Sequence, residues 1–199
     1  MNIYVLMKRT FDTEEKIQIE QGEINTDGAE FIINPYDEYA IEEALQLKEK
    51  HGGEITVVTV GEEEAEKELR TALAMGCDKA VLINIEDDLE EADQYTASAI
   101  LYNYLKDREY DIILGGNVAI DGGSGQVAPR LAELLGIPCI TTITKLTVNG
   151  GDVEAERDAE GDLEVIQTSL PIVATAQQGL NEPRYPSLPG IMKAKKKPD

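Results

Sequence analysis

Residues 111–136 read DIILGGNVAIDGGSGQVAPRLAELLG. An apolar run ending in Gly115-Gly116 comes first, and the glycine-rich turn Ala119–Pro129 connects it to apolar residues at helical spacing, namely Val127, Leu131, Leu134 and Leu135. Such glycines bring backbone N–H groups close to a ligand, and the positive end of the helix dipole favours a phosphate there. The spacing matches neither GxGxxG nor the P-loop. The turn alone therefore fits either a phosphate site or an ordinary strand-to-helix connection.

Apolar runs and amphipathic segments alternate along the rest of the chain. Helices are predicted over about 34–52, 63–75, 91–108 and 126–136. Strands are predicted at Ile3–Met7, Ile55–Val60, Ala80–Ile85, Ile112–Leu114 and Ile172–Ala176. This alternation predicts an α/β fold with three layers, in which a doubly wound, mostly parallel sheet has helices on both faces. Ligands of such sheets bind beyond the carboxyl ends of the strands, where the strand order reverses, and the glycine turn lies at such an end.

Two inserted segments and a short C-terminal tail depart from this alternation of strands and helices. Residues 16–33 predict a β-hairpin insertion, and residues 146–170, with Asn149-Gly150-Gly151 and Glu160-Gly161-Asp162, predict antiparallel strands added to one edge. We therefore expect one Rossmann-like nucleotide-binding domain over residues 1–192, followed by the start of a C-terminal arm at 193–199.

The start of the first helix has its own signals. Asn34 is expected to cap it and Pro35 to occupy its first turn. Asp37 in that turn fits an interaction with the helix dipole better than a ligand role on these grounds.

Composition excludes several classes of function. The formal net charge of −21 argues against nucleic acid, whose phosphates would be repelled. No apolar run is long enough for membrane insertion, and no secretory signal is recognisable, so a cytoplasmic protein is expected. Cys77 and Cys139 lack metal-binding spacing. The chain has one histidine, His51, and no nucleophile at a recognisable spacing from a base. We therefore expect that the chain is not an enzyme and has no metal site.

The segment before the tail reads QQGLNEPRYPSLPGIMK, residues 177–193. Three prolines in seven positions, Pro183, Pro186 and Pro189, predict neither helix nor strand. A stiff loop with Tyr185, Leu188 and Ile191 between its prolines would suit docking to another protein, because little entropy is lost on binding. The alternative is a loop whose apolar residues cover the core.

The residues just described resemble the β subunit of electron-transfer flavoproteins. The likeness includes Leu180-Asn181-Glu182-Pro183-Arg184-Tyr185, Leu188-Pro189 and Ile191–Lys197, as well as Lys8-Arg9, Asn34-Pro35-Tyr36-Asp37, Arg70–Gly76 and the Ala119–Gln126 turn. These motifs occur in register over essentially the whole chain. The resemblance implies an adenine-nucleotide-hydrolase-like version of the fold.

The resemblance also implies a function. Such a subunit forms a heterodimer with an α subunit, with the redox-active FAD at their interface, and holds AMP in its own site. It takes electrons from acyl-CoA or other flavin dehydrogenases, as in fatty acid β-oxidation, and performs no bond chemistry. By the same resemblance Tyr36 lies near the partner flavin, and Asp158 matches an acidic position associated with stability. The residues implied in the nucleotide site are Leu6, Asn34, Asp37, Val60, Ala119, Asp121, Gly122, Gly123, Ser124, Gly125, Gln126 and Val127. The residues implied in partner docking are Arg184, Tyr185, Leu188, Ile191, Met192 and Lys193.

Two departures from the family pattern leave alternatives open. Family members continue past the lysine cluster as an arm on the α subunit, whereas this chain stops at Lys197-Pro198-Asp199, which suggests truncation. Gly125-Gln126-Val127 is also less polar than the turn of AMP-binding members and is similar to bifurcating members, whose β subunit holds its own FAD. A nucleotide-binding homodimer of the universal-stress type is the alternative from another class.

Overall fold

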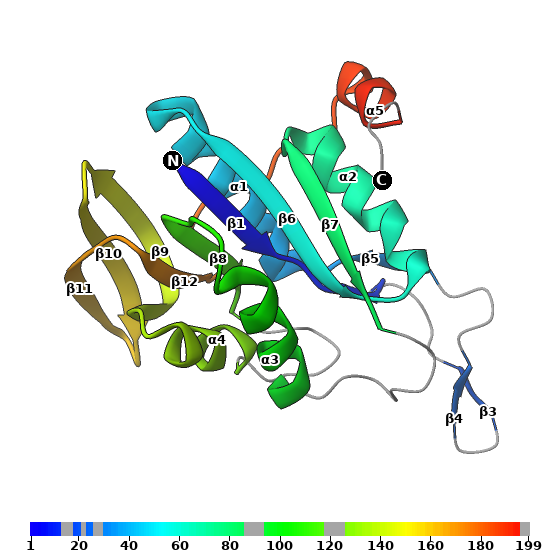
Figure 1. Cartoon of the computed structure of the whole chain (residues 1–199), viewed down its shortest axis with the longest axis horizontal. Coiled ribbons are helices and arrows are strands. Elements are labelled where there is room, and N and C mark those ends of the chain that lie inside the picture. The colour runs from blue at the N-terminus through cyan, green and yellow to red at the C-terminus, as the bar shows by residue number, and fades with distance from the viewer. Residues whose placement is uncertain (13–17, 21–22, 26–29, 86–93, 118–125, 196–199) are drawn as a thin grey trace.

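The strands of the core sheet form where the sequence has short, nearly continuous apolar runs, as expected for strands buried on both faces. The computed structural model describes residues 1–12, 18–20, 23–25, 30–85, 94–117 and 126–195. The sheet has eight strands in the order β11-β10-β9-β12-β8-β1-β6-β7 (Figure 1). Their bounds are β1 Asn2–Leu6, β6 Glu54–Gly61, β7 Lys79–Asn84, β8 Ile112–Gly116, β9 Cys139–Asn149, β10 Asp152–Ala159, β11 Asp162–Ser169 and β12 Ile172–Ala176.

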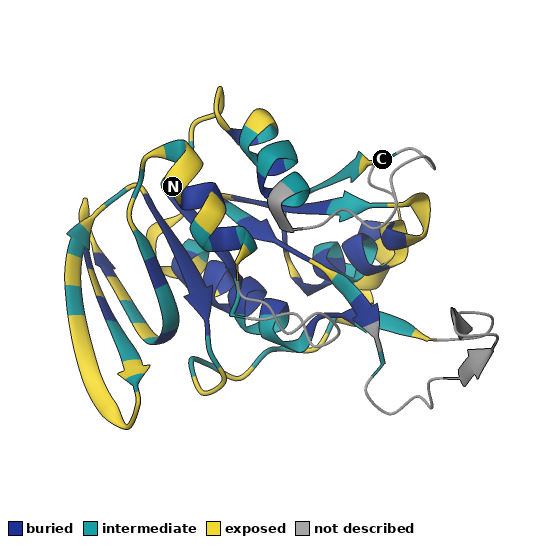
Figure 2. Cartoon of the chain, turned by 90° about the horizontal axis from the view of Figure 1, so that it is seen from below, coloured by how far each residue is buried: buried dark blue, intermediate teal, exposed yellow. Residues whose placement is uncertain are grey.

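The strands from β9 to β7 run parallel, and β10 and β11 add an antiparallel extension at the β9 edge. The extension is exposed along much of β11, as Figure 2 shows. Two small antiparallel pairs lie outside this sheet: β2 (Arg9–Phe11) with β5 (Phe31–Ile33), and β3 (Gln18–Glu20) with β4 (Glu23–Asn25).

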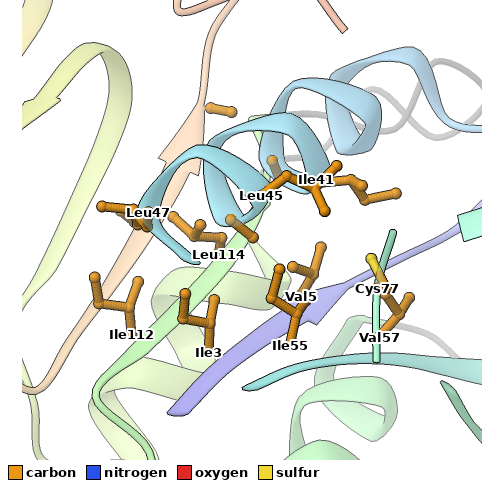
Figure 3. Packing of buried hydrophobic residues seen from close by; sticks show 14 of the residues in the cluster. Ile3, Val5, Ile41, Leu45, Leu47, Ile55, Val57, Cys77, Ile112 and Leu114 are labelled. Carbon is orange, nitrogen blue, oxygen red and sulfur yellow. The ribbon is translucent and has the colours of Figure 1, made fainter. Parts of the chain in front are cut away.

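Helices cover both faces of the sheet. On one face, Ile3 and Val5 of β1 and Ile112 of β8 pack with Ile41 and other apolar residues of α1 (Pro35–His51) (Figure 3). The helix α2 (Glu66–Met75), which the short η1 (Glu63–Ala65) precedes, packs on the same side through Leu69 and Ala72. On the opposite face, Leu6 and Ile113 pack with α3 (Gln94–Leu105) and α4 (Val127–Leu135). The predicted three-layer fold with antiparallel edge strands is therefore confirmed. No helix in the described ranges is long and apolar enough to cross a membrane.

One strand lies partly outside the predicted range. β9 begins at Cys139, pairs in parallel with β12 through Ile143, and only then continues as an antiparallel partner of β10. Thr141, Thr142 and Thr144 interrupt the apolar residues of its first half, so no apolar run marks it. Thr142 adopts a positive φ of 57° beside a shift in register, which marks the change from one pairing to the other.

The exclusion of a helix from the proline-rich segment was wrong. α5 spans Leu188–Ala194. Pro189 lies in its first turn, where the missing N–H has no intrahelical partner to lose. Ser187 caps the helix, because its Oγ accepts a hydrogen bond from the Gly190 N–H at 3.0 Å.

Candidate functional site

The strand order reverses between β1 and β8. From β1 the chain passes through α1 to β6 on one side, whereas β8 lies on the other side and leads through α4 to β9. The carboxyl ends of β1 and β8 are neighbours, with Val5 opposite Leu114. In open α/β sheets this is the place where ligands bind.

Asp37 lies at this point and joins three segments of the chain. Its Oδ2 accepts the Lys8 N–H at 2.7 Å, and its Oδ1 accepts the Gly116 N–H at 2.8 Å. We call this arrangement the Asp37 clasp. Asp37 is 5 % exposed, and burial raises the pKa of its carboxyl group to about 7, although the bonds from Lys8, Gly116 and the Asn34 side chain favour the charged form. The clasp holds the ends of β1 and β8 against the start of α1.

Gly116 is required for this close approach. A Cβ placed on Gly116 would lie 2.5 Å from Asp37 Oδ1 and 2.7 Å from Tyr36 Cβ. Tyr36, half-buried in the first turn of α1, therefore lies at the same edge of the sheet. Neither the Lys8 N–H nor Gly116 was singled out for the site, because the Gly116–Asp37 bond spans 79 positions of sequence.

The predicted N-cap position of Asn34 and the place of Pro35 in the first turn of α1 are confirmed, although the side chain of Asn34 does not make the cap. Asn34 occupies the N-cap position, but its side chain makes no capping hydrogen bond and interacts with Asp37 instead. Its backbone carbonyl accepts the Asp37 N–H at 2.8 Å. Asn34 therefore supports the clasp through its side chain and the start of α1 through its backbone carbonyl.

Most described residues of the predicted nucleotide site lie at this edge. Leu6 ends β1, Val60 lies near the end of β6, and Asn34 with Asp37 begins α1. Gln126 and Val127 begin α4, whereas Ala119, Asp121, Gly122, Gly123, Ser124 and Gly125 lie outside the described residues.

The start of α4 is positioned by α3. Ser98 Oγ donates to the Val127 carbonyl at 3.3 Å. The Gln126 side chain does not cap the helix and accepts instead from Arg130 at 3.3 Å. The positive end of the α4 dipole is therefore held at the same edge without a cap from Gln126.

The predicted docking residues lie along the chain after β12. Residues 177–187, which we call the strap, cross α1 and lead to α5 on α2. Tyr185 is 93 % and Leu188 is 71 % exposed, and Ile191, Met192 and Lys193 are also exposed. The alternative in which Tyr185 and Leu188 cover the core is therefore wrong. Arg184 differs from the others, because its guanidinium binds Glu42 of α1 through two bonds of 2.8 and 3.0 Å.

Asp158 lies far along the antiparallel extension. It is exposed, and its Oδ1 accepts the Gly161 N–H at 3.3 Å in the turn between β10 and β11. This contact supports a local role in the turn.

Comparison with known proteins gives a consistent family. Residues 21–198 match the family described as Electron transfer flavoprotein domain. Over its whole length the chain is 81 % identical to the electron transfer flavoprotein subunit beta of Bacillus subtilis (strain 168), of which it covers 77 %. It is also 46 % identical over its whole length to the protein of the same name from Syntrophomonas wolfei, of which it covers 78 %. A relative of that name from Thermoanaerobacterium thermosaccharolyticum is 41 % identical over 98 % of the chain, which covers 75 % of that protein.

Proposed function

The chain belongs to the electron transfer flavoprotein β-subunit family, and we propose that it acts as an electron-carrier subunit in the cytoplasm. It pairs with an α subunit whose FAD it helps to shield, with Tyr36 near that flavin. It holds AMP at the edge of the sheet closed by the Asp37 clasp. It docks acyl-CoA or other flavin dehydrogenases through residues 184–193, which we call the recognition segment.

The observation that carries the nucleotide proposal is the geometry of the clasp. Asp37 commits both carboxylate oxygens to backbone N–H groups, so its role is to fix the edge where the strand order reverses. Two further observations at that edge support a nucleotide site. Among the described residues, a Cβ on Gly61 at the end of β6 would meet Ala65 Cβ at 3.8 Å, an ordinary contact, and the α4 dipole favours a phosphate.

Nucleotide identity is tested by denaturing the purified α–β complex and weighing the released nucleotides. One FAD and one AMP per complex support the proposal. Two FAD support the second candidate, a bifurcating subunit with its own FAD, which the sequence Gly125-Gln126-Val127 favours. Absence of an adenine nucleotide beyond the α-subunit FAD would refute both. A colourless homodimer that forms no complex with a co-expressed α subunit would support the universal-stress alternative.

Docking is supported by the exposure of apolar side chains on the recognition segment. The variant Leu188→Ala should slow reduction of the complex by an acyl-CoA dehydrogenase by about tenfold while FAD content stays unchanged. Leu163→Ala is the matched control, because Leu163 is 63 % exposed on β11, away from the recognition segment. Equal rates for both variants would refute the docking role.

A further inference from the structure

The strap is attached to α1 at two places. Asn181 Nδ2 donates to the Tyr39 carbonyl at 2.9 Å and to Glu43 Oε2 at 3.2 Å. Arg184 Nε and Nη2 donate to the two oxygens of Glu42 at 2.8 and 3.0 Å. A planar guanidinium that binds both oxygens of one carboxylate fixes orientation as well as distance.

The strap binds three carboxylates of α1. Glu42 and Glu43 are buried, whereas Glu49, which accepts from Arg184 Nη1 at 2.5 Å, is exposed. Glu42 is 4 % and Glu43 is 6 % exposed. Burying a carboxylate without a partner is strongly unfavourable. The contacts therefore stabilise both the buried carboxylates of α1 and the position of the strap. Burial alone would raise the pKa of Glu42, but the bonds from Arg184 and Gln46 leave that pKa below its ordinary value. Arg184 is therefore held by a charged and desolvated partner.

The far end of the recognition segment is attached to α2. Gly190 of α5 lies so close to α2 that an added Cβ would be 2.2 Å from the Ala74 carbonyl oxygen. Arg70 Nη1 donates to the Ala194 carbonyl at 3.0 Å. Tyr185 and Leu188, both exposed, thus lie between two fixed points, Arg184 on α1 and Gly190 on α2.

We propose that the Glu42–Arg184 pair, with Asn181, is a positioning device that sets Tyr185 and Leu188 in their docking arrangement before a dehydrogenase arrives. The inference depends on the proposed docking function and adds Glu42 and Asn181, which lie outside the recognition segment. A segment already ordered loses little conformational entropy on binding, so the complex with the dehydrogenase forms at lower concentration. Loosening the pair should raise the KM for the dehydrogenase and leave kcat unchanged.

The test compares three variants of the α–β complex. Glu42→Gln removes the buried charge, and Arg184→Lys keeps the positive charge but cannot bind both oxygens of Glu42. Glu54→Gln is the matched control, because it removes an exposed ion pair to Lys79 at 3.0 Å on the β6–β7 side of the sheet. Three quantities are measured: KM and kcat with an acyl-CoA dehydrogenase, the rate of reduction by dithionite, and hydrogen exchange of residues 178–192.

We expect Glu42→Gln to raise KM by about tenfold, with faster exchange in residues 178–192 and unchanged kcat and dithionite reduction. Arg184→Lys should give a smaller rise in KM, and Glu54→Gln less than a twofold change. Faster exchange with an unchanged KM would overturn the positioning role. Should Glu42→Gln fail to assemble with the α subunit, Arg184→Lys against Glu54→Gln decides the question. If Leu188→Ala also leaves KM unchanged, the docking function itself fails, which separates the two outcomes.

Discussion

The variant Gly116→Ala tests the Asp37 clasp directly. An added Cβ would lie 2.5 Å from Asp37 Oδ1 and 2.8 Å from the Asp37 backbone nitrogen, whereas apolar carbons pack at about 3.5 Å or more. Both atoms belong to the first turn of α1, so either α1 or the end of β8 must move by about 1 Å.

The energetic cost has two parts. Overpacking of a filled interior costs about 1–3 kcal/mol. The movement also breaks or lengthens the Gly116 N–H bond to a charged group, worth about 1.5–3 kcal/mol. We expect the free energy of unfolding to fall by about 4 kcal/mol, measured by urea titration with circular dichroism.

Gly115→Ala is the control on the same strand. A Cβ on Gly115 would meet Leu6 Cβ at 3.7 Å, which is an ordinary contact. Its unfolding free energy should stay within about 1 kcal/mol of the parent chain. If the two alanine variants unfold at the same urea concentration, the argument from the clasp is refuted. Nucleotide retained by the α–β complex should decrease for Gly116→Ala only.

Three further changes probe other contacts. Gly190→Ala should lift α5 from the Ala74 carbonyl at a cost of about 1–3 kcal/mol, seen as faster proteolysis within residues 185–194; equal proteolysis would contradict the packing. Ser187→Ala should destabilise α5 by about 1 kcal/mol through loss of its cap, seen as faster amide exchange at Gly190. Because the pKa of Asp37 is raised, its contribution to stability is fully present below about pH 4 and is lost as the pH rises through about 7. Asp37→Asn should therefore flatten the fall in unfolding free energy between about pH 4 and pH 7, and parallel curves for parent and variant would contradict this.

The parallel core could be predicted because its strands are buried on both faces. Runs such as Ile112–Leu114 and Ile172–Ala176 have no competing interpretation at this length, and alternating helices dictate the layers. The first half of β9 could not be found in this way, because Thr141 and Thr144 interrupt its apolar residues. The helix α5 is not predicted because three prolines in seven positions disfavour a helix, whereas Pro189 lies in a first turn, where proline is tolerated.

The sequence predicts where the candidate nucleotide site lies in the fold, but not the hydrogen bonds that hold it together. The carboxyl edge near Asp37 follows from the order of elements, and Leu6 and Asn34 were placed there by resemblance. The bonds from Lys8 and Gly116 to Asp37 join positions 29 and 79 residues apart, which no local pattern reveals. Arg184 was expected on the docking surface, but its partner Glu42 appears only when α1 and the strap are seen together.

The sequence distance between Glu42 and Arg184 bears on how the molecule is assembled. The two residues are 142 positions apart, so their bond closes a long loop, and we expect it to form after the sheet and α1. During synthesis on the ribosome, Glu42 and Glu43 of α1 emerge long before Asn181 and Arg184, so they have no partner on the strap until most of the chain has been made. Refolding should accordingly order the sheet first and the strap last, and the strap should be among the first parts to open transiently.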